Sequence, residues 1–231
     1  MLPFTDNLAL RAANLLRARA GVSAGAGLLL RKRIPIAAGL GGGSADAAAA
    51  LLGLQHLWSV TTLDLAPLAA ELGSDVPFFL GGPTALVQGR GERLEPLPCQ
   101  PPRPLILVRP RTPLSTRDVF NALRADEWTD GSRSHHVARV MAAGGTVPED
   151  LLTNGLLTAA ERCLPLLTAL RRSLEAIGLR PLLSGSGPTF FLLTGDAEAW
   201  SAILEAVGDF DADVLRCNTL NSAPLQLHAE T

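Results

Sequence analysis

The chain has 231 residues, a formal net charge of −2, and 47% hydrophobic and 18% charged residues, which describes one large or two small folded domains and excludes intrinsic disorder. Its 20 basic residues are offset by 22 acidic ones, so it lacks the basic excess of a nucleic-acid-binding protein. Every long apolar stretch is interrupted before it reaches about 18 residues, the length of a membrane span. Because no secretory signal opens the sequence and no CxxC pair occurs, we expect a cytoplasmic protein.

The first part of the chain is predicted to combine helices with short strands. Thr5 or Asp6 can cap a first helix that runs to about Ala20. The elements expected after it are a strand over residues 28–34, a helix over 45–58 with Ser44 as its N-cap, a helix over 63–72, a loop over 73–79, and strands over 84–88 and 93–97. A proline-rich run over 96–104 is the best linker candidate, so we divide the chain into domains over residues 1–103 and 104–231.

The second domain is predicted to mix strands and helices. The expected elements are a strand over residues 105–108, a polar loop over 128–136, a long helical stretch over 156–176 with Pro165 inside it, strands over 182–184 and 189–193, a helix over 197–207 and a strand over 213–217. A Gly-Ser-Gly-Pro turn over 185–188 connects two of these strands. We expect Cys99, Cys163 and Cys217 to be small buried residues.

One glycine-rich segment carries the strongest chemical signal. It reads Ile-Ala-Ala-Gly-Leu-Gly-Gly-Gly-Ser-Ala-Asp over residues 36–46, between a predicted strand and a predicted helix. Such a turn presents the unpaired N–H groups of the first helical turn to a phosphate, where the helix dipole is positive. A loop that only caps the helix would not need four glycines, which cost about 3 kcal/mol of backbone entropy. The segment therefore predicts a phosphate-binding loop.

Several well-known nucleotide and hydrolase motifs do not fit this segment or the rest of the chain. No lysine follows the glycines as in the Walker pattern, and Ser44 stands where a G-x-G-x-x-G fingerprint has its third glycine. The His-Arg-Asp and Asp-Phe-Gly signatures of protein kinases are absent, as is HExxH. These absences argue against a protein kinase and a zincin protease.

The segment Pro-Ile-Ala-Ala-Gly-Leu-Gly-Gly-Gly-Ser-Ala-Asp-Ala over residues 35–47 resembles the ATP loop of the GHMP small-molecule kinases, and Leu-Ser-Gly-Ser-Gly-Pro-Thr over 183–189 resembles their C-terminal glycine motif. The triple glycine, together with Leu-Gly-Ser-Asp-Val-Pro-Phe-Phe over 72–79, is typical of the branch that acts on 4-diphosphocytidyl-2-C-methyl-D-erythritol in non-mevalonate isoprenoid synthesis. The resemblance runs from Asp6 to about Pro224. It implies an α+β fold of two domains, the first like the second domain of ribosomal protein S5 and the second ferredoxin-like, with the active site in the cleft between them.

The resemblance also implies roles for individual residues. ATP and Mg²⁺ are the implied cofactors, a small molecule is the substrate, and Asp75 matches the base that accepts the proton of the alcohol. Phe120 matches an aromatic residue that packs against cytosine, although a place in the core would also suit it. The implied ATP-binding residues are Pro35, Ile36, Ala37, Ala38, Gly39, Leu40, Gly41, Gly42, Gly43, Ser44 and Ala45, with Gly185 and Gly187, for which a plain tight turn is the alternative.

Other polar residues are assigned no catalytic role. Asp46 follows the loop in the first helical turn, where the helix dipole stabilises a carboxylate, so we favour a structural role over Mg²⁺ binding. His56 is expected to be packed or partly exposed beside Trp58, and His135 and His136 are expected in a solvated turn. We assign no metal ligand, and the sequence does not determine an oligomeric state.

The sequence departs from the family pattern before the ATP loop. Family members carry a Pro-x-Lys-x-Asn-Leu strand and a Gly-Tyr-His segment, and neither occurs here, where Lys32 is the single lysine. We expect about 60 further residues upstream of Met1. The alternative is a genuinely shortened relative that binds nucleotide without normal turnover. A GHMP kinase for another small alcohol, such as homoserine or mevalonate, is a further alternative, although those kinases usually show Gly-Leu-Gly-Ser-Ser.

Overall fold

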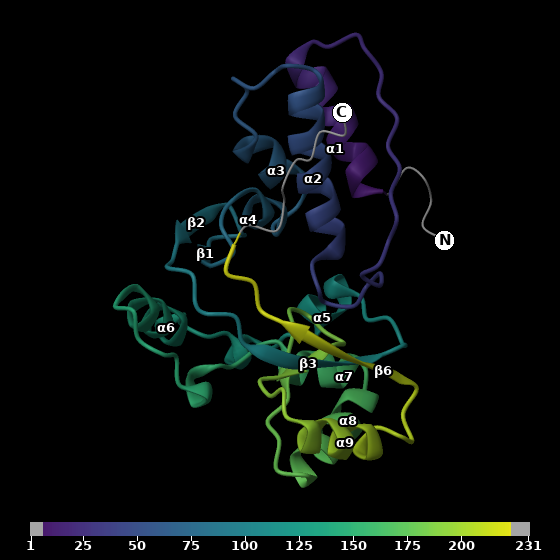
Figure 1. Cartoon of the computed structure of the whole chain (residues 1–231), viewed down its shortest axis with the longest axis vertical. Coiled ribbons are helices and arrows are strands. Elements are labelled where there is room, and N and C mark those ends of the chain that lie inside the picture. Colours follow the sequence, from purple (N-terminus) through teal and green to yellow (C-terminus); the bar gives the residue numbers. More distant parts are fainter. Residues whose placement is uncertain (1–6, 223–231) are drawn as a thin grey trace. The chain divides into compact units, whose positions relative to one another are not determined.

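The computed structural model describes residues 7–222, which divide into two compact units (Figure 1). The first unit holds the described residues up to Arg33, then Gly41–Gln100 and the described residues from Leu220 onward. The second unit holds Ile34–Leu40 and Pro101–Thr219. We expected Ile34–Leu40 in the first domain, but this segment packs with the second unit. The hydroxyls that bind its carbonyls, those of Ser184 and Thr189, belong to the second unit as well.

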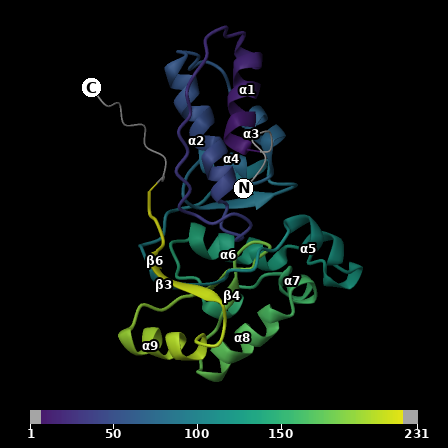
Figure 2. The ribbon, with the colours of Figure 1, turned by 90° about the vertical axis from the view of Figure 1, so that its right-hand side faces the viewer.

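The described part of the first unit consists of four helices and a β-hairpin. They are α1 (Leu8–Ala20), α2 (Gly42–Leu57), α3 (Ala66–Leu72), α4 (Val76–Leu80), β1 (Ala85–Gln88) and β2 (Arg93–Pro96). Helices α1 and α2 lie side by side in Figures 1 and 2. Ala12 of α1 and Ala47 and Ala48 of α2 are fully buried in one core, so small side chains allow the two helices to pack closely.

Several boundaries predicted for the first unit are wrong. The N-cap of α1 is Asn7, whose Oδ1 accepts the N–H of Ala9 at 2.9 Å; Thr5 and Asp6 lie outside the described residues. Helix α2 starts earlier than predicted because Gly41 adopts a left-handed conformation and acts as its N-cap, which places Ser44 inside the helix. The predicted loop over residues 73–79 contains the start of α4, where a proline in the first turn is compatible with a helix.

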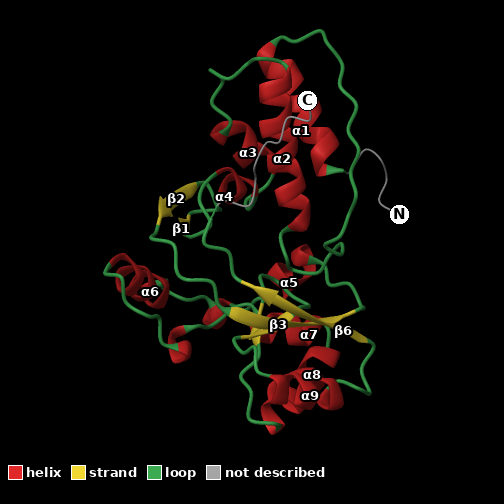
Figure 3. Ribbon diagram, in the orientation of Figure 1, coloured by secondary structure: helices red, strands yellow, loops and turns green. Residues whose placement is uncertain are grey.

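The strand predicted over residues 28–34 does not form. Residues 22–33 have no regular secondary structure (Figure 3), and Leu29 is 84% exposed. A strand needs a neighbouring strand that pairs with its N–H and C=O groups, and none of residues 7–222 forms a ladder with this segment. The leucine-rich composition indicates a local preference for β-structure, but composition does not supply a partner strand, and the prediction is wrong.

In its described residues the second unit contains a four-stranded antiparallel sheet in the order β4–β5–β3–β6. The strands are β3 (Pro104–Pro110), β4 (Leu182–Leu183), β5 (Phe190–Leu192) and β6 (Ala212–Asn218). The helices are α5 (Thr116–Ala122), α6 (Ser132–Ala142), α7 (Leu157–Cys163), α8 (Leu166–Ala176) and α9 (Ala197–Ala206), with short turns η2 (Ala125–Glu127) and η3 (Glu149–Leu151). Helices lie between β3 and β4 and between β5 and β6, which confirms the predicted ferredoxin-like arrangement.

The core of the second unit lies between this sheet and its helices. Helices α8 and α9 cover one face of the sheet in Figure 2. Leu170 of α8 and Ile203 of α9 join Ile106 of β3 and Phe190 of β5 in one buried cluster. Burial of such side chains is the main stabilising contribution to this unit, at about 1.5–3 kcal/mol for each one fully removed from water.

Two predictions for the second unit and one for the cysteines are wrong. The long helix over residues 156–176 is divided into α7 and α8 at Pro165, which has no N–H to continue the helical ladder. The predicted polar loop over 128–136 contains the start of α6, so His135 and His136 lie on a helix. Of the cysteines expected in the core, Cys99 and Cys163 are exposed and Cys217 is half-buried, because they lie in the proline-rich connection, at the end of α7 and on the outer strand β6.

No described helix has the length and apolar character needed to cross a membrane.

A bidentate salt bridge between Arg162 and Glu127 holds the connection between α5 and α7. The guanidinium of Arg162 donates to both carboxylate oxygens of Glu127, each at 2.6 Å, and to the Ala122 carbonyl at the end of α5. These hydrogen bonds from Arg162, helped by the N–H of Arg124, lower the pKa of Glu127 from 4.5 to about 2. The carboxylate therefore stays ionised and paired well into the acid range.

We expect Glu127→Gln to lower stability at neutral pH and to flatten its acid dependence. The pKa of Glu127 is lower in the folded chain than in the unfolded chain, so the stabilisation is complete above pH 4.5 and is lost as the pH falls towards about 2. Urea unfolding midpoints measured across this window should approach those of the unaltered chain at the acid end. Glu205→Gln, an exposed change on α9, is the control, and parallel curves for Glu127→Gln and the unaltered chain would contradict the expectation.

Candidate functional site

The part of the first glycine motif that ends at Leu40 lies directly against the second motif, inside the second unit. Gly39 of the first motif has φ +71°, and a Cβ there would come within 2.4 Å of the Ser184 carbonyl oxygen and 2.6 Å of the Gly187 carbonyl oxygen. Gly185 of the second motif has φ +54°, and its Cβ would lie 3.1 Å from the Gly39 carbonyl oxygen. Both the left-handed backbone and the lack of space therefore require glycine at position 39.

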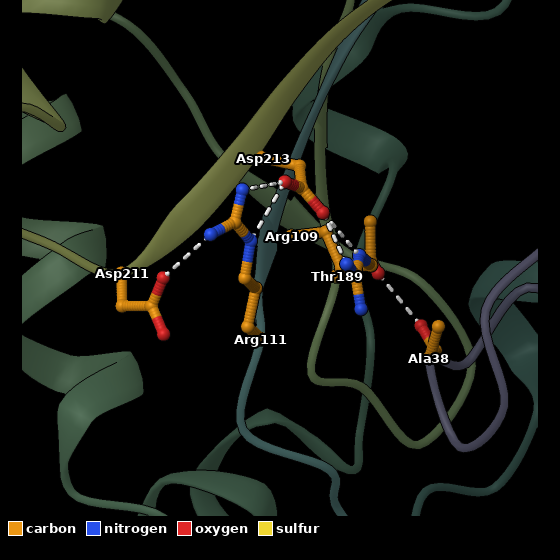
Figure 4. Close-up of polar contacts among 6 residues, drawn as sticks. All are labelled: Ala38, Arg109, Arg111, Thr189, Asp211 and Asp213. Atoms are coloured by element: carbon orange, nitrogen blue, oxygen red, sulfur yellow. Dashed lines mark hydrogen bonds and ion pairs between the residues drawn. The ribbon is translucent and has the colours of Figure 1, made fainter.

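Two hydroxyl groups hold carbonyls of the first motif. Thr189 is fully buried and donates to the Ala38 carbonyl at 2.7 Å, as Figure 4 shows. Ser184 donates to the Gly39 carbonyl at 2.8 Å. In a trans peptide the C=O and the following N–H point in opposite directions, so the N–H groups of Gly39 and Leu40 point away from these hydroxyls. The backbone donors of the loop are thereby directed away from the second motif.

An ion-pair cluster stabilises the sheet beside this contact. In Figure 4, Arg109 of β3 and Arg111, which follows β3, converge on Asp213 of β6, and Arg111 also reaches Asp211 at 3.1 Å. Hydrogen bonds from Arg109, and then from Arg111, lower the pKa of Asp213. These charged groups pair with one another across β3 and β6, so we assign the cluster to the sheet rather than to a ligand.

The rest of the first motif forms the N-terminus of α2 in the first unit. Gly41 is the N-cap, with φ +66°, and no side chain caps the helix. The N–H groups of the first turn, which include those of Gly42 and Gly43, have no acceptor within the helix. The helix is 16 residues long, and its dipole places partial positive charge at this end. The chemistry of these donors fits a phosphate group.

Asp75 lies in the same unit, at the start of α4. It is the N-cap residue of that helix, but its exposed side chain makes no capping hydrogen bond. Helix α4 packs against α2, and the ring of Phe79 comes within 2.8 Å of the position that a Cβ of Gly41 would take. The helix that begins at Asp75 therefore contacts the turn that begins α2. A carboxylate without a capping bond has its oxygens available to accept a proton.

Gly91 supports the residue before Asp75. Its φ is +122°, and a Cβ there would lie 2.0 Å from the Ser74 carbonyl oxygen. The turn of the β-hairpin thus packs directly against the backbone that leads into α4. In the sequence, Gly91 stands in a Gly-Arg-Gly turn between two predicted strands, and such a turn allows a close backbone approach.

The remaining predicted residues are placed as follows. The carboxylate of Asp46 forms an ion pair with Lys32, which supports the structural role we favoured. Phe120 lies on α5 and is 50% exposed, so it is not a core residue. At the start of the same helix, the hydroxyl of Thr116 lies 2.8 Å from that of Ser186. Helix α5, which carries Phe120, is thus hydrogen-bonded to the second glycine motif.

Known proteins share both sequence and structure with this chain. The GHMP kinases N terminal domain matches residues 7–82. A 4-diphosphocytidyl-2-C-methyl-D-erythritol kinase from Pelotomaculum thermopropionicum is 43% identical over 224 residues, which cover 95% of this chain and 78% of that protein. A protein of the same name from Symbiobacterium thermophilum is 38% identical over 222 residues, which cover 93% of this chain and 78% of that protein.

Solved structures agree with this likeness. The crystal structure of a 4-(cytidine 5'-diphospho)-2C-methyl-D-erythritol kinase has a TM-score of 0.72 and 37% sequence identity, over 94% of this chain and 80% of that one. A homoserine kinase from Cytophaga hutchinsonii has a TM-score of 0.74 at 18% identity, over 94% of this chain and 77% of that one, and shows the shared fold. The predicted α+β GHMP kinase fold is confirmed, and the chain belongs to the 4-diphosphocytidyl-2-C-methyl-D-erythritol kinase family.

Proposed function

We propose that this chain transfers the γ-phosphoryl group of ATP to the 2-hydroxyl of 4-diphosphocytidyl-2-C-methyl-D-erythritol, in the cytoplasm. The observation that carries the proposal is the first glycine motif, whose carbonyls at Ala38 and Gly39 are held by hydroxyls and whose continuation is the uncapped N-terminus of α2. A relative that matches 95% of the chain bears the name of this activity. The enzyme class is that of a phosphotransferase acting on an alcohol.

The residues of the loop fit a nucleoside triphosphate. The N–H groups at the start of α2 can donate to phosphate oxygens, and residues 35–45 together with Gly185 and Gly187 are the proposed ATP-binding positions. When bound, Mg²⁺ neutralises the charge on the phosphates and is held largely by them and by water. Asp46 is paired with Lys32, so we assign no carboxylate ligand of the metal at this end of α2.

Asp75 is the proposed catalytic base, and Phe120 the proposed contact for the cytosine ring. The alcohol must lose its proton as the phosphoryl group arrives, and a positioned carboxylate that accepts it contributes about 10²–10⁴ in rate. The side chain of Asp75 is exposed and makes no capping bond. The half-exposed ring of Phe120 offers a flat apolar face that suits a nucleobase.

An acceptor panel tests the substrate. The full chain is incubated with γ-labelled ATP and, separately, with 4-diphosphocytidyl-2-C-methyl-D-erythritol, homoserine and mevalonate. We expect label only on the first alcohol, with the new ester at its 2-hydroxyl by phosphorus NMR. Transfer to homoserine or mevalonate instead would assign the chain to another alcohol, and ATP binding without any transfer would favour a nucleotide-binding protein that lacks turnover.

Asp75→Asn tests the base. We expect kcat to fall by about 100-fold or more, because an amide does not accept the proton, while calorimetry shows nearly unchanged ATP affinity. Asp209→Asn, at an exposed aspartate in the turn before β6, is the matched control and should keep the kcat of the unaltered chain. Normal turnover of Asp75→Asn would remove Asp75 from this role.

Gly39→Ala tests the loop. The new Cβ would come within 2.4 Å of a backbone carbonyl oxygen, so the loop must move, and we expect ATP affinity to fall by about tenfold or more. Gly53→Ala on α2 is the matched control, because no atom lies within 4 Å of its added Cβ; alanine should stabilise the helix by up to about 1 kcal/mol without changing affinity. Calorimetry measures the ATP affinity of each variant, and thermal unfolding measures its stability. Equal ATP affinities of the two variants would contradict the assignment of the loop.

A further inference from the structure

A side chain outside both glycine motifs holds the second motif in place. Asn154 lies in the connection between η3 and α7, and both the nitrogen and the oxygen of its side-chain amide form hydrogen bonds with backbone groups. Its Nδ2 donates to the Leu183 carbonyl at 2.8 Å and to the Gly185 carbonyl at 2.7 Å, while its Oδ1 accepts the N–H of Leu156 at 2.8 Å. Only an amide offers two donors and an acceptor on one short side chain.

The two carbonyls bound by Asn154 belong to the neighbours of Ser184. Ser184 is the residue whose hydroxyl donates to the Gly39 carbonyl at 2.8 Å. Gly185 also faces Gly39, since its Cβ would lie 3.1 Å from that same carbonyl oxygen. Asn154 therefore fixes the backbone on both sides of the residue that binds the loop. All of these groups belong to the second unit.

The turn needs such a restraint because of its composition. Gly185 has φ +54° and Gly187 has φ +83°, and glycine adopts left-handed and right-handed backbone conformations with similar ease. Strand β4 has two residues before this turn, and β5 has three after it. The short ladder constrains the turn weakly, so a side chain that binds two of its carbonyls selects one conformation.

We propose that Asn154 is a positioning residue for ATP binding. Its amide holds the backbone of residues 183–185 in the conformation in which Ser184 and Gly185 meet Gly39, and the loop then presents its N–H groups to the nucleotide. The inference rests on the proposed function, because it assumes that residues 35–45 bind ATP. Asn154 acts through the second motif and makes no contact with the reacting groups.

Asn154→Asp is the most direct test. The change keeps the size of the side chain and the acceptor for Leu156, but it places an oxygen against two carbonyl oxygens. We expect the Kd for a nonhydrolysable ATP analogue, measured by calorimetry, to rise about tenfold or more. The KM for ATP should rise with it, while kcat at saturating ATP and the KM for the alcohol stay close to those of the unaltered chain.

Asn154→Ala tests the role of Asn154 in ATP binding if Asn154→Asp does not fold. Removal of both donors without added repulsion should raise the Kd in the same direction by a smaller factor. Arg180→Gln is the matched control, because Arg180 donates to the Leu152 carbonyl at 2.7 Å and anchors the same connection without touching the turn. It should lose comparable thermal stability and keep the ATP affinity of the unaltered chain.

The outcomes separate the inference from the proposed function. Unchanged ATP affinity in both Asn154 variants, or an equal loss of affinity in Arg180→Gln, overturns the role of Asn154 and leaves the proposed function intact. Failure of the unaltered chain to bind the ATP analogue overturns the proposed function, and the inference about Asn154 with it.

Discussion

The close approach of Gly39 to the backbone of Ser184 and Gly187 is the contact on which the rest of the site depends. A Cβ at position 39 would lie 2.4 and 2.6 Å from two carbonyl oxygens, a separation that ordinary packing does not allow. Because the backbones meet without side chains between them, the hydroxyls of Ser184 and Thr189 reach the carbonyls of Gly39 and Ala38. The start of the first motif and the second motif, which are far apart in the sequence, thus form one structural element in the second unit.

In the first motif the backbone carbonyls and the backbone N–H groups have different roles. Along its first half the carbonyl oxygens are used for structure, since those of Ala37, Ala38 and Gly39 all accept hydrogen bonds from the second unit. At its end the N–H groups remain unpaired within the helix, because Gly41 caps α2 with its backbone alone. Backbone N–H groups without an acceptor in the helix are chemically suited to an anion, which is the basis of the proposed ATP site.

A structural element could be predicted from the sequence where neighbouring residues alone determine it. The strands of the hairpin and of the second unit were predicted close to their observed positions, because turn residues and alternation of hydrophobic residues are local signals. Their ferredoxin-like arrangement was implied by the family resemblance. The strand over residues 28–34 was wrong because strand formation needs a partner strand. Ser44 was chosen as a cap on side-chain preference, but the left-handed Gly41 begins α2 earlier. Asn154 gave no signal, since it acts on carbonyls 29 and 31 residues away.

The most direct test of the central claim is a crystal structure of the full chain with a nonhydrolysable ATP analogue and Mg²⁺. The account predicts that phosphate oxygens accept hydrogen bonds from the N–H groups of the first turn of α2, with Gly39 still against Ser184. Phosphates bound at another surface, with these N–H groups facing water, would contradict it.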